Sequence, residues 1–144
     1  MFSKACEYGI KATIFIVSNS SEGKAVSLKE IADHINSPSA FTSKILQKLV
    51  KQKLIKSTRG TNGGFHVPEN ALKNFTLARI VTAIDGDSIY KGCGLGLEEC
   101  DESRPCPLHH RFKSVRDNLQ HLLETTSLED LAKDLKKGNV FLKL

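Results

Sequence analysis

The chain has 144 residues, 40% of them hydrophobic, and a formal net charge of +5. This length suffices for one domain with a buried core, and no run of eighteen apolar residues is present that would span a bilayer, so no membrane partner is expected. The first residues show no secretory-signal pattern, and the four cysteines therefore favour thiol or metal chemistry in a reducing cytoplasm over a disulfide framework.

Positive charge is concentrated in the first half of the chain. Residues 1–67 hold ten Lys and Arg against four Asp and Glu, whereas residues 68–144 hold eleven against twelve. No acidic residue occurs between Asp33 and Glu69, while six basic residues do: Lys44, Lys48, Lys51, Lys53, Lys56 and Arg59. Such a stretch favours a polyanionic partner, although a solvated lysine-rich helix face gives the same pattern.

Three helices are predicted before residue 52. The first covers residues 4–19, and the second begins at a capping box formed by Ser27 and Glu30 and ends near Asn36. The third begins at Ser37-Pro38-Ser39 and has an apolar side opposite a polar, basic side. Two short helices joined by a turn, the second basic on its outer face, are typical of a helix-turn-helix.

A β-hairpin is predicted directly after the third helix. Residues 54–59 and 65–67 are β-prone segments on either side of Asn62-Gly63-Gly64, residues that tolerate positive φ. A hairpin in this position is a wing, and an arginine near its tip is suited to a minor groove. The candidate DNA contacts are Ser39, Ser43 and Lys44 in the major groove, Lys48 on phosphate and Arg59 on the wing.

Three further helices are predicted in the second half. Thr76 caps the first, which stops at Asp85-Gly86, and Ser127 begins the last, which ends near Gly138. Between them a row of apolar residues is spaced by 4, 3, 4 and 3 positions: Leu108, Phe112, Val115, Leu119 and Leu122. This heptad spacing suits a helix-on-helix seam, although a plain buried helix shows the same pattern over so short a length.

The expected fold is mainly α with a small β wing, a winged helix-turn-helix plus a long dimerisation helix. We expect the DNA-binding domain over residues 1–85, with 76–85 as a supporting helix. A cysteine-rich cluster loop follows over 86–107, and the dimerisation helix and C-terminal helix occupy 108–144.

Cys93, Cys100, Cys106 and His109 fall within seventeen residues. Thiolates are preferred ligands of iron–sulfur clusters and of zinc. The spacing between these cysteines differs from the tight pairs of zinc knuckles and suits a loop around a larger inorganic core. Four carboxylates between residues 98 and 102 are expected to raise the pKa values of the thiols in an empty, mobile loop. Reduced free thiols are the alternative interpretation.

Residues 54–60, followed by Gly63-Gly64-Phe65, resemble the wing signature of the bacterial IscR/NsrR/RirA/CymR-type regulators, the iron–sulfur cluster regulator family. The segment Tyr8-Gly9-Ile10-Lys11-Ala12 and the cysteine loop also fall where that family has its counterparts, so the resemblance covers essentially the whole chain. One departure is Lys53, where the family often has glycine. The resemblance implies a winged-helix homodimer that binds operator DNA, often with an iron–sulfur cluster as its switch.

In the resembled family the fourth cluster ligand varies. His109 stands where some members have a ligating histidine, and Glu7 stands where others supply a carboxylate, in some cases from the partner subunit. We favour His109 over Glu7. The cluster is expected to be 2Fe–2S or 4Fe–4S, and the sequence does not distinguish between the two.

The sequence thus predicts a dimeric, DNA-binding transcription regulator that senses its signal through an iron–sulfur cluster. No Gly-rich phosphate loop or nucleophile elbow is present, so no enzyme is expected. The alternatives are a cluster-free regulator of the same fold that responds to a protein partner, and a zinc-binding module for nucleic-acid or protein contacts. Cys6 is expected in the core, and His34 is expected to be structural or solvent-facing.

Overall fold

The computed structural model describes residues 1–20 and 24–143, so Leu144 of the predicted C-terminal segment lies outside the described residues. As predicted, the fold is mainly helical with one two-stranded antiparallel sheet. The described part of the chain holds no helix that is long and apolar enough to cross a membrane. Its elements are α1 (Lys4–Asn19), α2 (Leu28–Ile35), α3 (Ser39–Lys51), β1 (Lys56–Thr58), β2 (Gly64–His66), α4 (Glu69–Leu72), α5 (Leu77–Asp85), α6 (Ser88–Lys91), α7 (His109–Thr125) and α8 (Leu128–Lys136).

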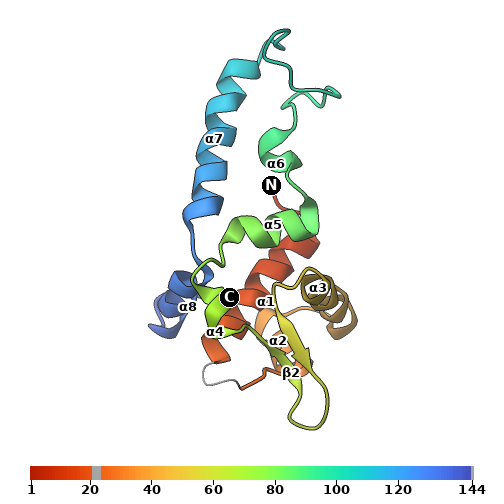
Figure 1. Cartoon of the computed structure of the whole chain (residues 1–144), viewed down its shortest axis with the longest axis vertical. Helices are drawn as coiled ribbons and strands as arrows, with labels where there is room; N and C mark the ends of the chain where they lie inside the picture. Colours follow the sequence, from red (N-terminus) through yellow and green to blue (C-terminus); the bar gives the residue numbers. More distant parts are fainter. Residues whose placement is uncertain (21–23, 144) are drawn as a thin grey trace.

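Helix α1 lies at the centre of the fold, and α2, α3, α5 and α8 pack around it (Figure 1). Its N-terminus is capped by Ser3, whose hydroxyl accepts a hydrogen bond from the backbone N–H of Cys6 at 3.0 Å. Gly9 lets α5 and α3 approach closely, because a Cβ there would collide with Ile84 and lie 3.3 Å from Ile45. The predicted helix over residues 4–19 is confirmed.

The predicted capping box of α2 is present. The Ser27 hydroxyl accepts from the backbone N–H of Glu30 at 3.2 Å, and the Glu30 carboxylate accepts from the backbone N–H of Ser27 at 3.0 Å. Together they satisfy two amides that the first helical turn leaves unpaired. The helix ends at Ile35 and is capped by Asn36, whose φ of 53° is left-handed and suits asparagine.

Helix α3 begins within the predicted segment, at Ser39, but without a serine cap. Pro38 occupies the N-cap position, where it supplies no side-chain hydrogen bond. The hydroxyl of Ser37 instead accepts from the Thr42 hydroxyl at 2.8 Å, which fastens the turn to the buried side of α3. The turn between α2 and α3 is therefore held by Thr42, one helical turn into α3, rather than by a cap at the start of that helix.

The predicted wing is the antiparallel pair β1–β2, which projects from the end of the molecule farthest from α6 (Figure 1). Lys53 connects α3 to this hairpin with a left-handed φ of 60°, the conformation that glycine adopts most easily. The hairpin is joined to the segment before α2 by two backbone hydrogen bonds of 2.8 Å between Val26 and Phe65. The wing is thus held by its connection to α3 at Lys53 and by its pairing with Val26.

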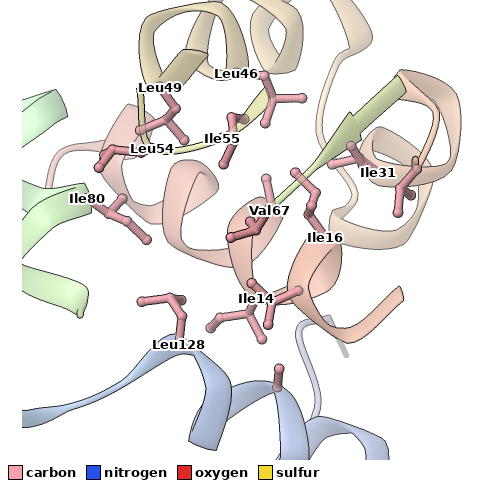
Figure 2. Packing of buried hydrophobic residues seen from close by; sticks show 14 of the residues in the cluster. Ile14, Ile16, Ile31, Leu46, Leu49, Leu54, Ile55, Val67, Ile80 and Leu128 are labelled. Carbon is pink, nitrogen blue, oxygen red and sulfur yellow. The ribbon is translucent and has the colours of Figure 1, made fainter. Parts of the chain in front are cut away.

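The core lies where α1, α3, α5 and α8 meet. Figure 2 shows side chains from these helices that converge on one cluster, among them Ile16, Leu46, Ile80 and Leu128. Each of these four is 0% exposed, and complete burial of such a side chain stabilises the fold by about 1.5–3 kcal/mol. The C-terminal helix α8 therefore shares a core with the helix-turn-helix.

Helix α5 is confirmed, but the predicted cap by the Thr76 side chain is wrong, because its hydroxyl makes no capping hydrogen bond. The backbone on either side of Thr76 pairs with the segment before α8 instead. The N–H of Leu77 donates to the Thr126 carbonyl at 3.0 Å, and the N–H of Leu128 donates to the Phe75 carbonyl at 2.8 Å. This pairing holds the starts of α5 and α8 together.

Helix α7 extends away from the core beside α6 (Figure 1). Leu123 is its fully buried apolar residue and packs with Cys6 and Val81 in a second, smaller cluster. The predicted heptad row is divided: Leu119 packs against this cluster, whereas Phe112, Val115 and Leu122 are 40%, 62% and 52% exposed. One side of α7 thus belongs to the core of its own chain, and another side is left uncovered.

Candidate DNA interface and cysteine centre

The predicted DNA contacts on α3 lie on the side that faces away from the core. Ser39 and Lys44 are exposed and Ser43 is half-buried, whereas Ile45, Leu46 and Leu49 on the opposite side are buried. The side-chain amide of Gln47 donates to the Ser43 hydroxyl at 3.3 Å. Gln47 is exposed on the same face, and sequence reasoning left it out of the candidate contacts, although its spacing of four residues from Ser43 places it there.

Lys48 has an intramolecular partner at the edge of this face. Its ammonium group donates to the backbone carbonyl of Ile84 at 3.0 Å, in the last turn of α5. The final carbonyls of a helix have no partner within it, so a lysine is a favourable partner. Next to this contact, the carboxylate of Asp85 accepts from the backbone N–H of Ser3 at 2.9 Å and also from its hydroxyl. The end of α5 is therefore fastened to both α1 and α3.

The wing tip carries the predicted minor-groove contact. Arg59 is exposed and directly follows β1. Gly60 has a φ of 105°, and the N–H of Gly63 donates to the Gly60 carbonyl at 3.0 Å, which closes a tight turn. The exposed β1 strand adds Lys56 next to it. The wing therefore presents positive charge, as the exposed face of α3 does.

The cysteine loop lies at the opposite end of the molecule from the wing, between α6 and α7 (Figure 1). Arg116 of α7 anchors its start by donating to the Gly92 carbonyl at 2.6 Å. Its end is fastened by the first turn of α7, where the N–H of His109 donates to the Cys106 carbonyl at 2.9 Å. The loop is therefore held at both ends by α7.

The four predicted donor residues of this loop form two pairs. The Sγ atoms of Cys93 and Cys106 lie 3.8 Å apart, and the Sγ of Cys100 lies 3.5 Å from Nδ1 of His109. Within residues 1–20 and 24–143, however, no three His, Cys, Asp or Glu side chains gather closely enough to hold one metal ion. Each predicted ligand thus lies close to one other predicted ligand, and the four do not surround one common point.

His109 is the most deeply placed of the four. Only 4% of it is exposed, and its Nε2 is buried without a hydrogen-bond partner in the described part of the chain. A buried polar atom without a partner is uncommon and calls for a ligand or an ordered group beside it. The three cysteines are half-buried. The other ring nitrogen of His109, Nδ1, is the one that faces Cys100. The donor chemistry of Nδ1 and the three thiols fits a soft-metal or iron–sulfur centre.

The expected rise in the thiol pKa values is wrong for Cys93, whose pKa is lowered. The backbone N–H groups of Leu95 and Leu97 are the largest cause, and Cys106 and the charge of Arg116 add to it. The N–H of Leu95 lies 3.4 Å from the sulfur. No carboxylate of the loop is among the causes of this shift. Amide donors and a cation thus favour the thiolate that metal binding requires.

The remaining sequence candidates lie outside the loop. Glu7 is half-buried in the first turns of α1 and forms an ion pair with Lys4 at 2.8 Å, which lowers the pKa of Glu7. Cys6 is fully buried, as predicted, and burial, followed by the nearby Asp85, raises the pKa of its thiol to about 12. Cys6 therefore stays a protonated core residue.

Comparisons with known proteins agree with this geometry. Residues 2–134 match the Rrf2 family, described as "Iron-dependent Transcriptional regulator". The chain is 26% identical to the HTH-type transcriptional regulator NsrR of Oceanobacillus iheyensis over 91% of this chain and 88% of that protein. It is also 26% identical to the HTH-type transcriptional regulator IscR of Xenorhabdus nematophila, over 88% of this chain and 76% of that one.

Solved structures show the same fold. The chain superposes on CymR, the global cysteine regulator of B. subtilis, with a TM-score of 0.75 and 24% identity, covering 92% of this chain and 96% of that one. It superposes on T. potens IscR with a TM-score of 0.74 and 19% identity, covering 97% and 91%. The named relatives are transcriptional regulators, a non-enzymatic role. With its family match spanning both the helix-turn-helix and the cysteine loop, this chain belongs to the Rrf2 family of transcriptional regulators.

Proposed function

We propose that the protein is a homodimeric regulator that binds operator DNA and senses its signal through a 2Fe–2S cluster held by Cys93, Cys100, Cys106 and His109. The observation that carries the cluster assignment is the pairing of these four donors. Membership of a family described as iron-dependent supports an iron centre.

The distances within each pair match two ligands of one tetrahedral metal. For metal–sulfur bonds of about 2.3 Å and metal–nitrogen bonds of about 2.0–2.1 Å, two thiolates lie about 3.8 Å apart, and a thiolate and an imidazole lie about 3.5 Å apart. The observed separations are 3.8 Å for Cys93 with Cys106 and 3.5 Å for Cys100 with His109. These two pairs would suit a 2Fe–2S centre, in which Cys93 with Cys106 and Cys100 with His109 would hold the cluster.

The two other metal assignments require different distances. One zinc ion would bring all four donors within reach of each other, and no group of three does so in the described residues. A 4Fe–4S cluster places each protein ligand on a different iron, so ligands in close pairs do not favour it. When bound, the 2Fe–2S cluster would supply one-electron redox chemistry and sensitivity to oxidants and nitric oxide.

DNA binding is proposed for the outer face of α3 and the wing. Ser39, Ser43 and Lys44 are assigned to the major groove, Lys48 to phosphate, and Arg59 to the minor groove. The contact of Lys48 with Ile84 suggests how the two ends of the molecule communicate. Displacement of the loop would pass through α6 to the end of α5, which Lys48 joins to the recognition helix α3.

Dimerisation is proposed through the uncovered side of α7. Phe112, Val115 and Leu122 lie on one stripe of the helix, and all three are at least 40% exposed. Val115→Glu is expected to yield a monomer by light scattering, because it puts a charge into the seam. Ser114→Glu, on another side of α7, should remain dimeric. An equally monomeric Ser114→Glu, or a dimeric Val115→Glu, would remove α7 from the interface.

The cluster proposal is tested by anaerobic purification, the visible absorption spectrum, and iron and sulfide analysis. We expect broad visible absorption and about two irons and two sulfides per chain. A Cys93/Cys100/Cys106 triple alanine variant should be colourless, whereas Cys6→Ala, outside the loop, should keep its colour. His109→Ala should lose or shift the absorption, while Glu7→Gln should not.

Other outcomes identify the alternatives. A colourless protein with one zinc ion per chain would identify the site as a zinc centre instead of a cluster. A colourless protein that cannot be reconstituted with iron and sulfide, yet binds its operator, would be a cluster-free regulator that responds to a protein partner. For the DNA assignment, Arg59→Ala should weaken binding most at sites with a narrow A·T-rich minor groove. Equal losses at all sites would contradict a minor-groove role.

A further inference from the structure

A cavity of about 400 Å³ lies between α1, α2, α8 and the residues that follow α8. This volume is in the range of small-molecule binding sites. Neither the exposed face of α3 nor the cysteine loop lines it. The cavity is therefore separate from the proposed DNA interface and from the proposed cluster, and neither of those functions explains it.

One wall of the cavity is a pair of stacked rings. Phe15 of α1 and His34 of α2 have ring centroids 4.1 Å apart and an interplanar angle of 17°. Burial, and then the charge of Lys143, lowers the pKa of His34, so its ring is neutral at pH 7. A neutral imidazole stacked on a phenyl ring offers a flat, largely apolar surface. Leu135 and Leu142 add aliphatic walls beside it.

The charged residues that line the cavity are lysines. Lys136 and Lys143 contribute to it, and no acidic residue among residues 1–20 and 24–143 lines it. Lys143 donates to the Asp33 carbonyl at 3.0 Å, which holds the chain end against α2. The neighbouring lysines are paired, Lys133 with Glu129 and Lys137 with Asp134. Lys136 has no ion-pair partner within residues 1–20 and 24–143.

We propose that this cavity binds a small organic carboxylate with a flat apolar body. The body lies against the stacked rings of Phe15 and His34, and the carboxylate faces the lysines. Charge complementarity carries the choice of ligand, since an apolar, aromatic-walled cavity whose charged residues are cations attracts an amphipathic anion. A neutral apolar compound would gain no attraction from the two exposed lysines, and a highly charged anion would not match the apolar walls.

The test is an NMR titration of the ¹⁵N-labelled full chain with 3-phenylpropanoate, compared with its neutral amide 3-phenylpropanamide at constant ionic strength. We expect saturable shifts of the backbone signals of Ser18, Asn19, His34 and residues 135–143, with an affinity in the millimolar range. The amide should bind at least about threefold more weakly, because it lacks the charge that the lysines attract.

Two neighbouring lysine variants make a matched pair. Lys136→Ala should weaken binding of 3-phenylpropanoate by about threefold or more, and Lys137→Ala should leave it unchanged, since Lys137 pairs with Asp134 and does not line the cavity. No saturable shift up to about 10 mM would overturn the site, because that concentration would detect millimolar binding. Equal affinity for acid and amide, or equal weakening in the two variants, would overturn the carboxylate assignment.

Discussion

Gly64 lies where the wing passes closest to the segment before α2, and its replacement tests how the wing is held. A Cβ at this position would lie 2.5 Å from the carbonyl carbon of Val26 and closer still to its oxygen. Both are backbone atoms, so no side chain can rotate away. Gly64→Ala must therefore separate the wing from Val26 or distort the hairpin.

The expected cost follows from what that separation breaks. The two 2.8 Å hydrogen bonds between Val26 and Phe65 lie next to Gly64, and each contributes about 0.5–1.5 kcal/mol. The φ of 154° at Gly64 is also unfavourable for alanine, and such backbone strain costs about 1–3 kcal/mol. Gly64→Ala should thus destabilise the fold by about 3 kcal/mol, or roughly 6–12 °C in Tm for a chain of this size.

Urea denaturation at fixed protein concentration measures this cost, with Gly60→Ala as the matched control. Gly60 has a positive φ of 105° in the same hairpin, but a Cβ there meets nothing within 4 Å. Gly60→Ala should lower the free energy of unfolding by only about 1 kcal/mol, because it adds backbone strain and no steric clash. If the two variants lose the same free energy of unfolding, the steric reasoning at Gly64 is refuted.

Three further predictions concern single positions. Lys53→Gly should raise the free energy of unfolding by about 0.5 kcal/mol, because glycine adopts the left-handed conformation of residue 53 without strain. Lys51→Gly within α3 should instead lower it by about 1 kcal/mol. A Lys53→Gly variant that is less stable than the parent in thermal unfolding would contradict this. Ser27→Ala should cost about 1 kcal/mol at pH 7. The Ser27 amide and hydroxyl lower the pKa of Glu30, so the contribution of Glu30 is present above its ordinary value of 4.5 and is lost as the pH falls through the lowered value. The cost of Ser27→Ala should therefore shrink in unfolding curves at pH 3, and a constant cost would argue against the reciprocal cap. In cluster-free protein, iodoacetamide should modify Cys93 and spare Cys6, because the pKa of Cys93 is lowered and that of Cys6 is raised to about 12; mass mapping that finds equal rates would reject this difference.

The sequence predicted those parts of the fold that depend on local patterns. The capping box at Ser27 and the cap at Ser127 involve residues three positions apart, so both are readable and both form. The four-residue helices α4 and α6 were not predicted, because they are too short to show a periodic pattern. The side chain of Thr76 was misassigned for another reason, since its backbone pairs with Ser127, fifty-one positions away in the sequence.

The candidate centre shows the same division between near and distant information. The donors fall within seventeen residues, so their gathering in one loop was predictable. Which donor pairs with which depends on the path of the loop between α6 and α7. The spacing of the donors in the sequence does not determine that path. The pKa of Cys93 was predicted in the wrong direction because formal charges are visible in a sequence, whereas the backbone amides of Leu95 and Leu97 that face the sulfur are not. Lys48 likewise looks like a free surface charge until α5 is placed beside it.

Helix α7 explains why its heptad row could not be interpreted from sequence alone. An apolar residue at helical spacing is equally compatible with the core of its own chain and with a partner's surface, and α7 carries both kinds. Leu123 is fully buried against Cys6 and Val81, while Val115, two turns earlier, is 62% exposed. The same helix also anchors the cysteine loop through Arg116 and His109. A partner packed along Val115 would therefore contact the helix that holds both ends of the loop, so the proposed dimer contact and the cysteine loop would share one helix.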